Sequence, residues 1–130
     1  MPFLKMIPTF TVITALLFAP LAAMQAAELT LTSPLDYQVV QRSSPGKGSV
    51  RIAGELPEDV PAADTSIEAK FVGEKNESGW LRAGGSITGK TLSGTVEAPA
   101  GGWWKMDVRV SRGGKEVAHG SVAHVGIGEV

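Results

Sequence analysis

The chain has 130 residues, with 12 Lys and Arg against 13 Asp and Glu, a formal net charge of -1 and no cysteine. Its acids and bases are interspersed, which leaves neither the basic surface that nucleic acid binding requires nor a patch for anionic lipid. The lack of cysteine excludes a disulfide framework and a lipid-modified amino terminus, so an ordinary hydrophobic core must stabilise the fold.

Residues 1–27 have the order of a secretory signal peptide, in which one positive charge precedes a long apolar run and small residues stand before Glu28. A retained membrane anchor is the alternative. However, Pro8 and Pro20 interrupt the segment, and its apolar core is shorter than the ~20 residues that span a bilayer. We therefore expect cleavage, a secreted or periplasmic location without membrane attachment, and one domain over residues 28–130.

Apolar and polar side chains alternate along most of the remaining chain, which is typical of half-buried strands. Strands are predicted, in chain order, at 28–33, 37–42, 49–56, 66–72, 79–83, 91–98, 103–110 and 115–125. Gly, Pro, Asn, Asp and Ser separate them, as in turns. The predicted core comprises Val50, Ile52, Ile67, Phe71, Trp104, Met106 and Val108.

Seven to eight short antiparallel strands without a helical stretch predict an all-β sandwich of the immunoglobulin or fibronectin III type. A closed β-barrel is the alternative at this point.

Residues Gly84 through Thr91 read GGSITGKT and satisfy the phosphate-binding pattern GxxxxGK[ST]. That chemistry needs a helix directly after the loop, because backbone amides at a helix start hold the phosphates. Gly94 and Pro99 follow instead, together with further glycines, and no helix can begin there. The stretch therefore predicts a hairpin turn and no nucleotide site.

The two histidines, His119 and His124, would lie on opposite faces of a regular strand. They could share a metal ion only if a bulge near Gly120 changed the alternation, and no third ligand stands out by spacing. No nucleophile elbow of the form GxSxG occurs. We therefore predict no metal, no cofactor and no catalytic residue in this chain.

The aromatic residues give the remaining candidate site. Trp104 alternates with the core residues, whereas Trp103 shares its face with charged residues and is expected to be partly exposed. Trp103, Trp80 and Tyr37 are candidates for stacking on sugar rings. Packing of Trp103 beneath a loop is the structural alternative.

Three stretches, SPLDYQVVQR (33–42), AGGWWKMDVRV (100–110) and HVGIGEV (124–130), resemble the amino-terminal β-sandwich of secreted bacterial carbohydrate esterases. These are the SGNH hydrolases of the sialate O-acetylesterase-like kind. In that family, a strand resembling VGIGEV leads into a Gly-Gln-Ser-Asn block whose serine is the nucleophile. This chain stops at Val130, before such a block, so the resemblance carries no catalytic residue to any position here.

The resemblance implies a non-catalytic accessory module, a fragment that packs on or orients a following SGNH esterase domain in the same or an adjacent chain. Whether the chain belongs to a working enzyme therefore depends on that partner. The alternative is a stand-alone module that binds polysaccharide through the three aromatic residues, or an adhesive sandwich without a sugar ligand.

Overall fold

The computed structural model of the chain describes residues 27–44, 48–61 and 63–128. The predicted signal peptide lies outside these ranges, except for Ala27, which begins the first strand. Across the described ranges, no helix is long and apolar enough to cross a bilayer.

The described residues form strands and connecting turns without a helix, which confirms the all-β prediction. The strands are β1 (Ala27–Glu28), β2 (Thr30–Ser33), β3 (Gln38–Gln41), β4 (Ser49–Glu55), β5 (Thr65–Val72), β6 (Glu77–Arg82), β7 (Gly84–Thr88), β8 (Thr91–Glu97), β9 (Gly102–Arg112) and β10 (Lys115–Gly128). The described residues thus form ten strands where seven to eight were expected. Leu29 divides the first predicted strand into β1 and β2, and the GGSIT stretch, predicted as part of a turn, forms β7.

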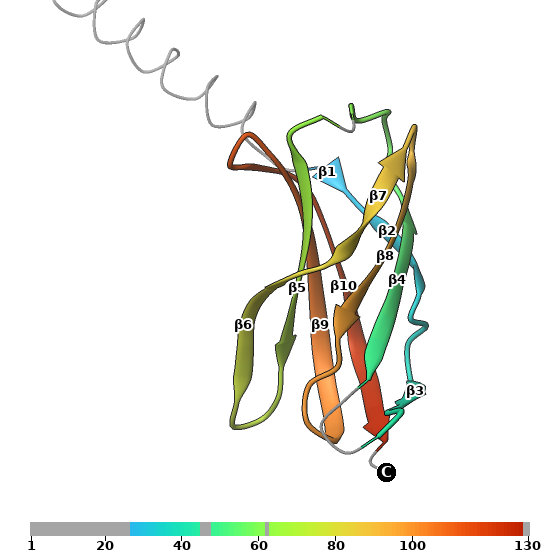
Figure 1. Cartoon of the computed structure of the whole chain (residues 1–130), viewed down its shortest axis with the longest axis vertical. Helices are drawn as coiled ribbons and strands as arrows, with labels where there is room; N and C mark the ends of the chain where they lie inside the picture. Colours follow the sequence, from blue (N-terminus) through green and yellow to red (C-terminus); the bar gives the residue numbers. More distant parts are fainter. Residues whose placement is uncertain (1–26, 45–47, 62, 129–130) are drawn as a thin grey trace, which may run out of the picture.

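Two sheets face each other across one core (Figure 1). The first sheet has the order β1-β10-β9-β5-β6, and β3 also pairs with β10; the second has the order β2-β4-β8-β7. Both sheets keep open edges within the described part of the chain, so the fold is not a closed barrel. Contrary to the all-antiparallel expectation, β1 and β3 pair with β10 in parallel.

The predicted alternation is confirmed in the central strands. Every second residue of β4, β5 and the middle of β9 is buried, and these side chains meet between the sheets. Trp104 is the exception, because it is only half-buried. Its ring packs nearly perpendicular to that of Phe71, with ring centroids 6.5 Å apart, and its indole N–H donates to the carbonyl oxygen of Ala100 at 2.9 Å. It therefore closes one end of the core rather than filling its centre.

Two of the connections between the sheets consist of a single residue. Leu29 links β1 to β2 and donates its N–H to the carbonyl of His119 at 2.9 Å. Ala83 links β6 to β7 and donates to the carbonyl of Ile67 at the same distance. Both linking side chains are buried, so each crossing adds to the core.

The GGSITGKT stretch forms the hairpin between β7 and β8, as predicted. Thr88 pairs with Thr91 across a two-residue turn, and Gly89 has a φ of 62°, which glycine adopts without the Cβ clash of other residues. A strand follows the lysine where a phosphate-binding loop would need a helix.

Candidate functional site

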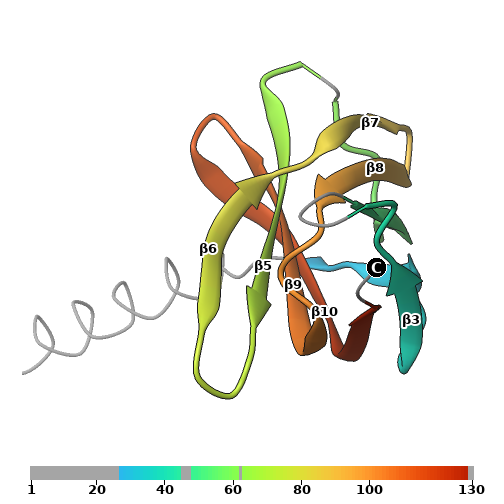
Figure 2. The same ribbon diagram turned by 60° about the horizontal axis from the view of Figure 1, so that its bottom comes forward.

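Three segments that are far apart in the sequence meet at one end of the first sheet. Residues 38–41 of β3 pair in parallel with residues 125–128 of β10. On the other side of β10, Gly102, Trp103 and Trp104 of β9 pair with residues 127, 126 and 125. Figure 2 shows β3 beside the end of β10 at this corner of the molecule. These strands position the candidate site.

Large apolar side chains are exposed at this corner. Among the described residues the exposed large hydrophobics are Leu35 (64%), Tyr37 (63%), Val39 (58%) and Trp103 (56%), which we call the end patch. The partial exposure predicted for Trp103 is confirmed. A gathering of such side chains, as opposed to scattered single ones, is typical of a binding surface.

The ring of Trp103 is held in a defined place. It meets Tyr37 edge to face, with ring centroids 6.1 Å apart and planes at 67°. It also covers Gly126: a Cβ at that position would lie 3.1 Å from the indole and 3.2 Å from Val39. Beside the ring is a shallow hollow of about 130 Å³, which we call the end hollow, lined by Val39, Gly102, Trp103, Gly126, Ile127 and Gly128.

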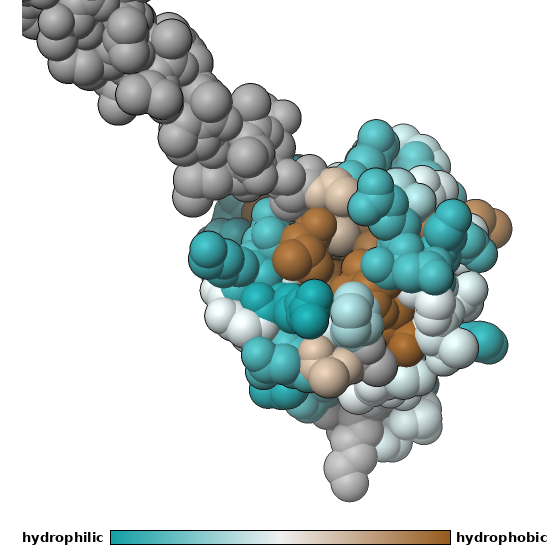
Figure 3. Space-filling view, turned by 90° about the horizontal axis from the view of Figure 1, so that it is seen from above, coloured by the Kyte–Doolittle hydropathy of each residue, from teal (hydrophilic) through white to brown (hydrophobic). Residues whose placement is uncertain are grey.

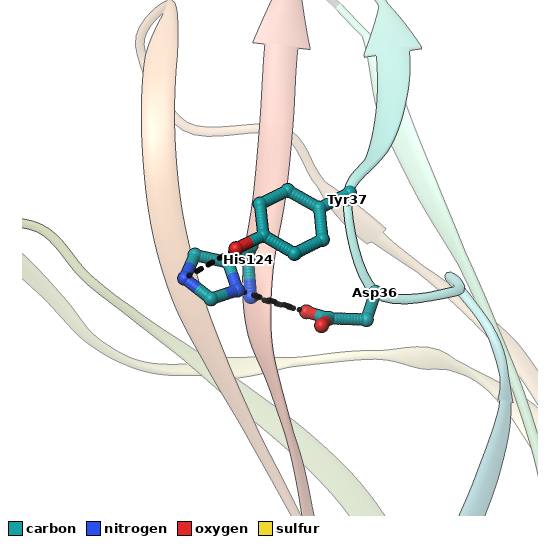
Figure 4. Close-up of polar contacts among 3 residues, drawn as sticks. All are labelled: Asp36, Tyr37 and His124. Carbon is teal, nitrogen blue, oxygen red and sulfur yellow. Dashed lines mark hydrogen bonds and ion pairs between the residues drawn. The ribbon is translucent and has the colours of Figure 1, made fainter.

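A cluster of hydrogen bonds fixes the loop that carries Tyr37 (Figure 4). One carboxylate oxygen of Asp36 accepts from the backbone N–H of His124 at 2.9 Å and from its ring Nδ1 at 3.1 Å. A carboxylate can only accept here, so Nδ1 carries the proton. The backbone N–H of Tyr37 donates in return to the carbonyl of His124 at 2.7 Å.

Tyr37 itself adopts an unfavourable backbone conformation. Its φ is 64°, in the left-handed region, which costs a bulky residue roughly 1–3 kcal/mol. The imidazole of His124 stacks on the phenol ring with centroids 4.1 Å apart, and the hydroxyl lies 3.4 Å from Nε2. The hydrogen bonds to His124 and this stacking offset the backbone strain, so the tyrosine is presented in one orientation.

Trp80 is not part of the end patch. It lies on β6 opposite Lys70 of β5, and the guanidinium of Arg109 sits 4.0 Å above its ring while the Lys70 amine is 5.0 Å away. Strand spacing and rise place the backbones of Trp80 and Trp103 roughly 16 Å apart. The structure therefore brings Tyr37 and Trp103 together and leaves the third candidate with its own cationic partners.

The two histidines have separate partners. The pairing of β10 with β9 is irregular at two places, between Glu116 and Ala118 and between Val122 and Val125, and neither is at Gly120. His119 is 3.9 Å from Asp107, whereas His124 is held by Asp36. Among the described residues, no three His, Cys, Asp or Glu side chains are grouped closely enough to hold a metal ion.

The opposite end of the molecule also shows apolar surface. Viewed from above, apolar residues lie inside a rim of hydrophilic ones (Figure 3). A hollow of about 150 Å³ in this region is lined by Ala27, Leu56, Pro57, Glu58, Asp59, Val60, Val117 and Ala118. Leu56 and Ala118 are core residues, so this hollow is the open end of the core and lacks an aromatic platform.

Sequence reasoning missed Asp36 and the structural role of His124. The two residues are 88 positions apart. Each lies in one of the stretches that resemble the esterase family, but nothing in these stretches indicates that the two side chains meet. The sequence gives one indication of a role for Asp36: it stands directly before Tyr37, at a position where aspartate favours a turn.

No protein-family model matches the chain, and no curated protein matches it. Among solved structures, a DUF4784 family protein from Bacteroides caccae ATCC 43185 is similar, with a TM-score of 0.44 and 15% sequence identity. The similarity covers 78% of this chain and 23% of that chain, so this chain spans less than a quarter of the matched protein. A similarity of this strength assigns neither a family nor a function.

Proposed function

We propose that this chain is a non-catalytic accessory module of a secreted carbohydrate esterase of the sialate O-acetylesterase-like kind, built as an immunoglobulin-like sandwich. In this proposal the end patch docks on a following SGNH esterase domain and orients it. The module supplies the surface, and the esterase domain supplies the catalytic residues.

The observation that carries the proposal is the convergence of the three stretches that resemble the esterase family. The first contains β3 and the loop before it, the second contains most of β9, and the third contains the end of β10. Although distant in sequence, their described parts are neighbours through direct strand pairing. If the resemblance came only from residues buried in the core, the three stretches would not together form an exposed surface.

The chemistry of the surface suits a protein partner. Tyr37 and Trp103 bury large areas at little conformational cost, and aromatic residues dominate the energetics of protein interfaces. Complete burial of a large apolar side chain contributes about 1.5–3 kcal/mol, so a partner that covered both would gain a useful part of its affinity here. Asp36 and His124 are half-exposed and would form part of a polar rim.

The experiment compares acetyl release from an O-acetylated sialic acid by two proteins: the 130-residue chain and the native product of its gene, isolated from the source organism. We expect no turnover by the chain and turnover by a longer native product that contains a serine hydrolase domain. Acetyl release by the 130-residue chain, or a native product that neither contains a hydrolase domain nor copurifies with one, would reject the proposal.

A stand-alone carbohydrate-binding module is the second candidate, favoured by the edge-to-face pair of Tyr37 and Trp103. Sugar rings stack on such exposed aromatic faces. Titration with soluble polysaccharides, followed by tryptophan fluorescence, tests it. A saturable signal that Trp103→Ala abolishes and Trp80→Phe retains would support this candidate over the first.

A further inference from the structure

The turn between β5 and β6 carries a short polar pattern that the fold itself does not require. Residues 74–78 read EKNES, in which Asn76, Glu77 and Ser78 match the acceptor pattern Asn-x-Ser/Thr for N-linked glycosylation. Bacterial enzymes that attach such glycans also recognise an acidic residue two positions before the asparagine, which here is Glu74. Asn76 is the only asparagine in the 130-residue chain. A pattern this short also occurs by chance, so the surroundings of Asn76 in the structure must support it.

The structure places Asn76 where an enzyme can reach its side chain. It ends the turn 73–76 between the two strands, and residues 74–76 are all exposed. The backbone N–H of Gly73 donates to the carbonyl of Asn76 at 2.7 Å and closes the turn. Among the described residues, no hydrogen bond holds the side-chain amide of Asn76. Modification of this amide therefore breaks no contact of the fold.

Ser78, which supplies the hydroxyl of the pattern, is bound within the folded hairpin. Its Oγ accepts from the backbone N–H of Phe71 at 2.9 Å and donates to the carbonyl of Gly79 at 2.7 Å. The side chain is also half-buried. An enzyme that recognises this hydroxyl cannot reach it in the closed hairpin. Transfer to Asn76 must therefore precede the pairing of β6 with β5.

The position of the turn leaves room for a glycan after folding. β6 is the outermost strand on one side of the first sheet, whereas β3 lies at the other side, next to β10. Figure 1 shows the turn between β5 and β6 at the end of this edge, at the lower left of the view. An open sheet edge can pair with another chain, and a bulky glycan beside β6 would hinder such pairing.

We propose that Asn76 is an N-glycosylation site that receives an oligosaccharide during export, before β6 pairs with β5. The inference rests on the export step of the proposed function and not on an esterase partner. The donor is an oligosaccharide joined to a polyprenyl diphosphate in the export membrane, and a membrane-bound oligosaccharyltransferase is the catalyst.

The transfer exchanges one bond for another at the anomeric carbon of the first sugar. The side-chain nitrogen Nδ2 of Asn76 forms a bond to this carbon, while the bond between the carbon and the diphosphate oxygen breaks. The polyprenyl diphosphate leaves with the bonding electron pair, and the amide gives one proton to a base of the transferase. Neither oxidant nor reductant is needed.

Mass spectrometry of the native protein tests the site directly. The protein is isolated from the periplasm or medium of its source organism and digested with trypsin. The tryptic peptide that ends at Arg82 contains the single asparagine of the chain. We expect this peptide to carry an oligosaccharide on Asn76, and a fully unmodified peptide from the exported protein would reject the inference alone. A chain that stays in the cytoplasm would reject the export step and the inference together.

A matched pair of variants, produced in the source organism, connects the glycan with the pattern. Asn76→Gln keeps an exposed amide but removes the acceptor, so the mass of the exported protein should fall by that of the whole glycan. Ser78→Thr keeps the hydroxyl that the pattern requires and should stay glycosylated. A glycan that persists in Asn76→Gln, or one that Ser78→Thr loses, would overturn the inference.

The order of transfer and folding is tested in vitro. Membranes of the source organism, which would hold the transferase and its donor, are mixed either with the folded, unmodified chain or with a peptide of residues 71–82. The folded chain must open its hairpin to release Ser78, so it should be modified roughly tenfold or more slowly than the peptide. Equal rates would contradict transfer before hairpin closure, and no transfer to either acceptor would reject the site.

Discussion

The two adjacent glycines of the GGSITGKT stretch should respond very differently to the same small change. In β7, Gly85 pairs with Gly94 of β8. A Cβ at Gly85 would lie 2.1 Å from the carbonyl oxygen of Ser93 and 2.4 Å from the Cα of Gly94. At Gly84 a Cβ would find nothing within 4 Å, and its φ is outside the left-handed region.

The size of the effect follows from these contacts. Both obstacles at Gly85 are backbone atoms, so they cannot turn aside, and β7 would have to move away from β8 by roughly 1 Å to relieve Gly85→Ala. Such a shift overstretches the neighbouring backbone hydrogen bonds, each worth about 0.5–1.5 kcal/mol. Together with overpacking, this gives a loss of about 2–4 kcal/mol. Gly84→Ala should stay within about 1 kcal/mol of the parent.

Thermal and urea unfolding of both variants, followed by circular dichroism, measures the difference. For a domain of this size, the expected loss lowers the midpoint of Gly85→Ala by roughly 10–20 °C. Gly84→Ala controls for the general effect of replacing a glycine in β7. Equal midpoints for the two variants would refute the reasoning, and would mean that the close approach of β7 to β8 does not explain the glycine at 85.

Two further predictions concern the outer face of the first sheet. Asp36→Ala removes the acceptor of two hydrogen bonds from His124, so amide hydrogen exchange in β3 should accelerate by about tenfold. Unchanged exchange would show that Asp36 does not hold β3 against β10. Arg109→Ala removes the cation over the Trp80 ring and the hydrogen bond to Glu68, so the free energy of unfolding should fall by about 1 kcal/mol. The tryptophan emission should also shift to the red, and an unshifted spectrum would contradict the stacking of Arg109 on Trp80.

Local alternation predicted the central strands because each of them buries one face. Val50 and Ile52 in β4, and Met106 and Val108 in β9, are fully buried as their spacing indicates. The glycines and prolines of the GGSITGKT region likewise indicated a hairpin, since they deny a helix its first turn. In these elements the local pattern and the tertiary fold agree.

The pairings that build the site depend on contacts that no local pattern records. β3 buries none of its side chains fully, so it has no clear alternation, and it is held by parallel pairing to a strand more than 80 positions away. Ala83 carries the chain from one sheet to the other, and the two glycines that follow it were predicted to form a turn, not to begin a strand of the second sheet. The predicted number of strands was wrong because the crossings at Leu29 and Ala83, which separate β1 from β2 and β6 from β7, depend on tertiary contacts.

The end patch ultimately depends on one extra residue in β10. Val122 pairs with Met106 and Val125 with Trp104, so three steps on β10 match two on β9. Without this bulge, the alternation would carry the glycines at 126 and 128 into the core and turn Val125 and Ile127 outward, because a shift of one residue exchanges the two faces of a strand. The bulge places His124 beside Asp36 and leaves Gly126 beneath Trp103. Deleting Ala123 would instead remove the extra residue itself and leave a regular strand in which Val125 still pairs with Trp104. Val125 and Ile127 should therefore stay buried in this variant, and the hollow beside Trp103 should be kept, which amide exchange and the exposure of Trp103 would check.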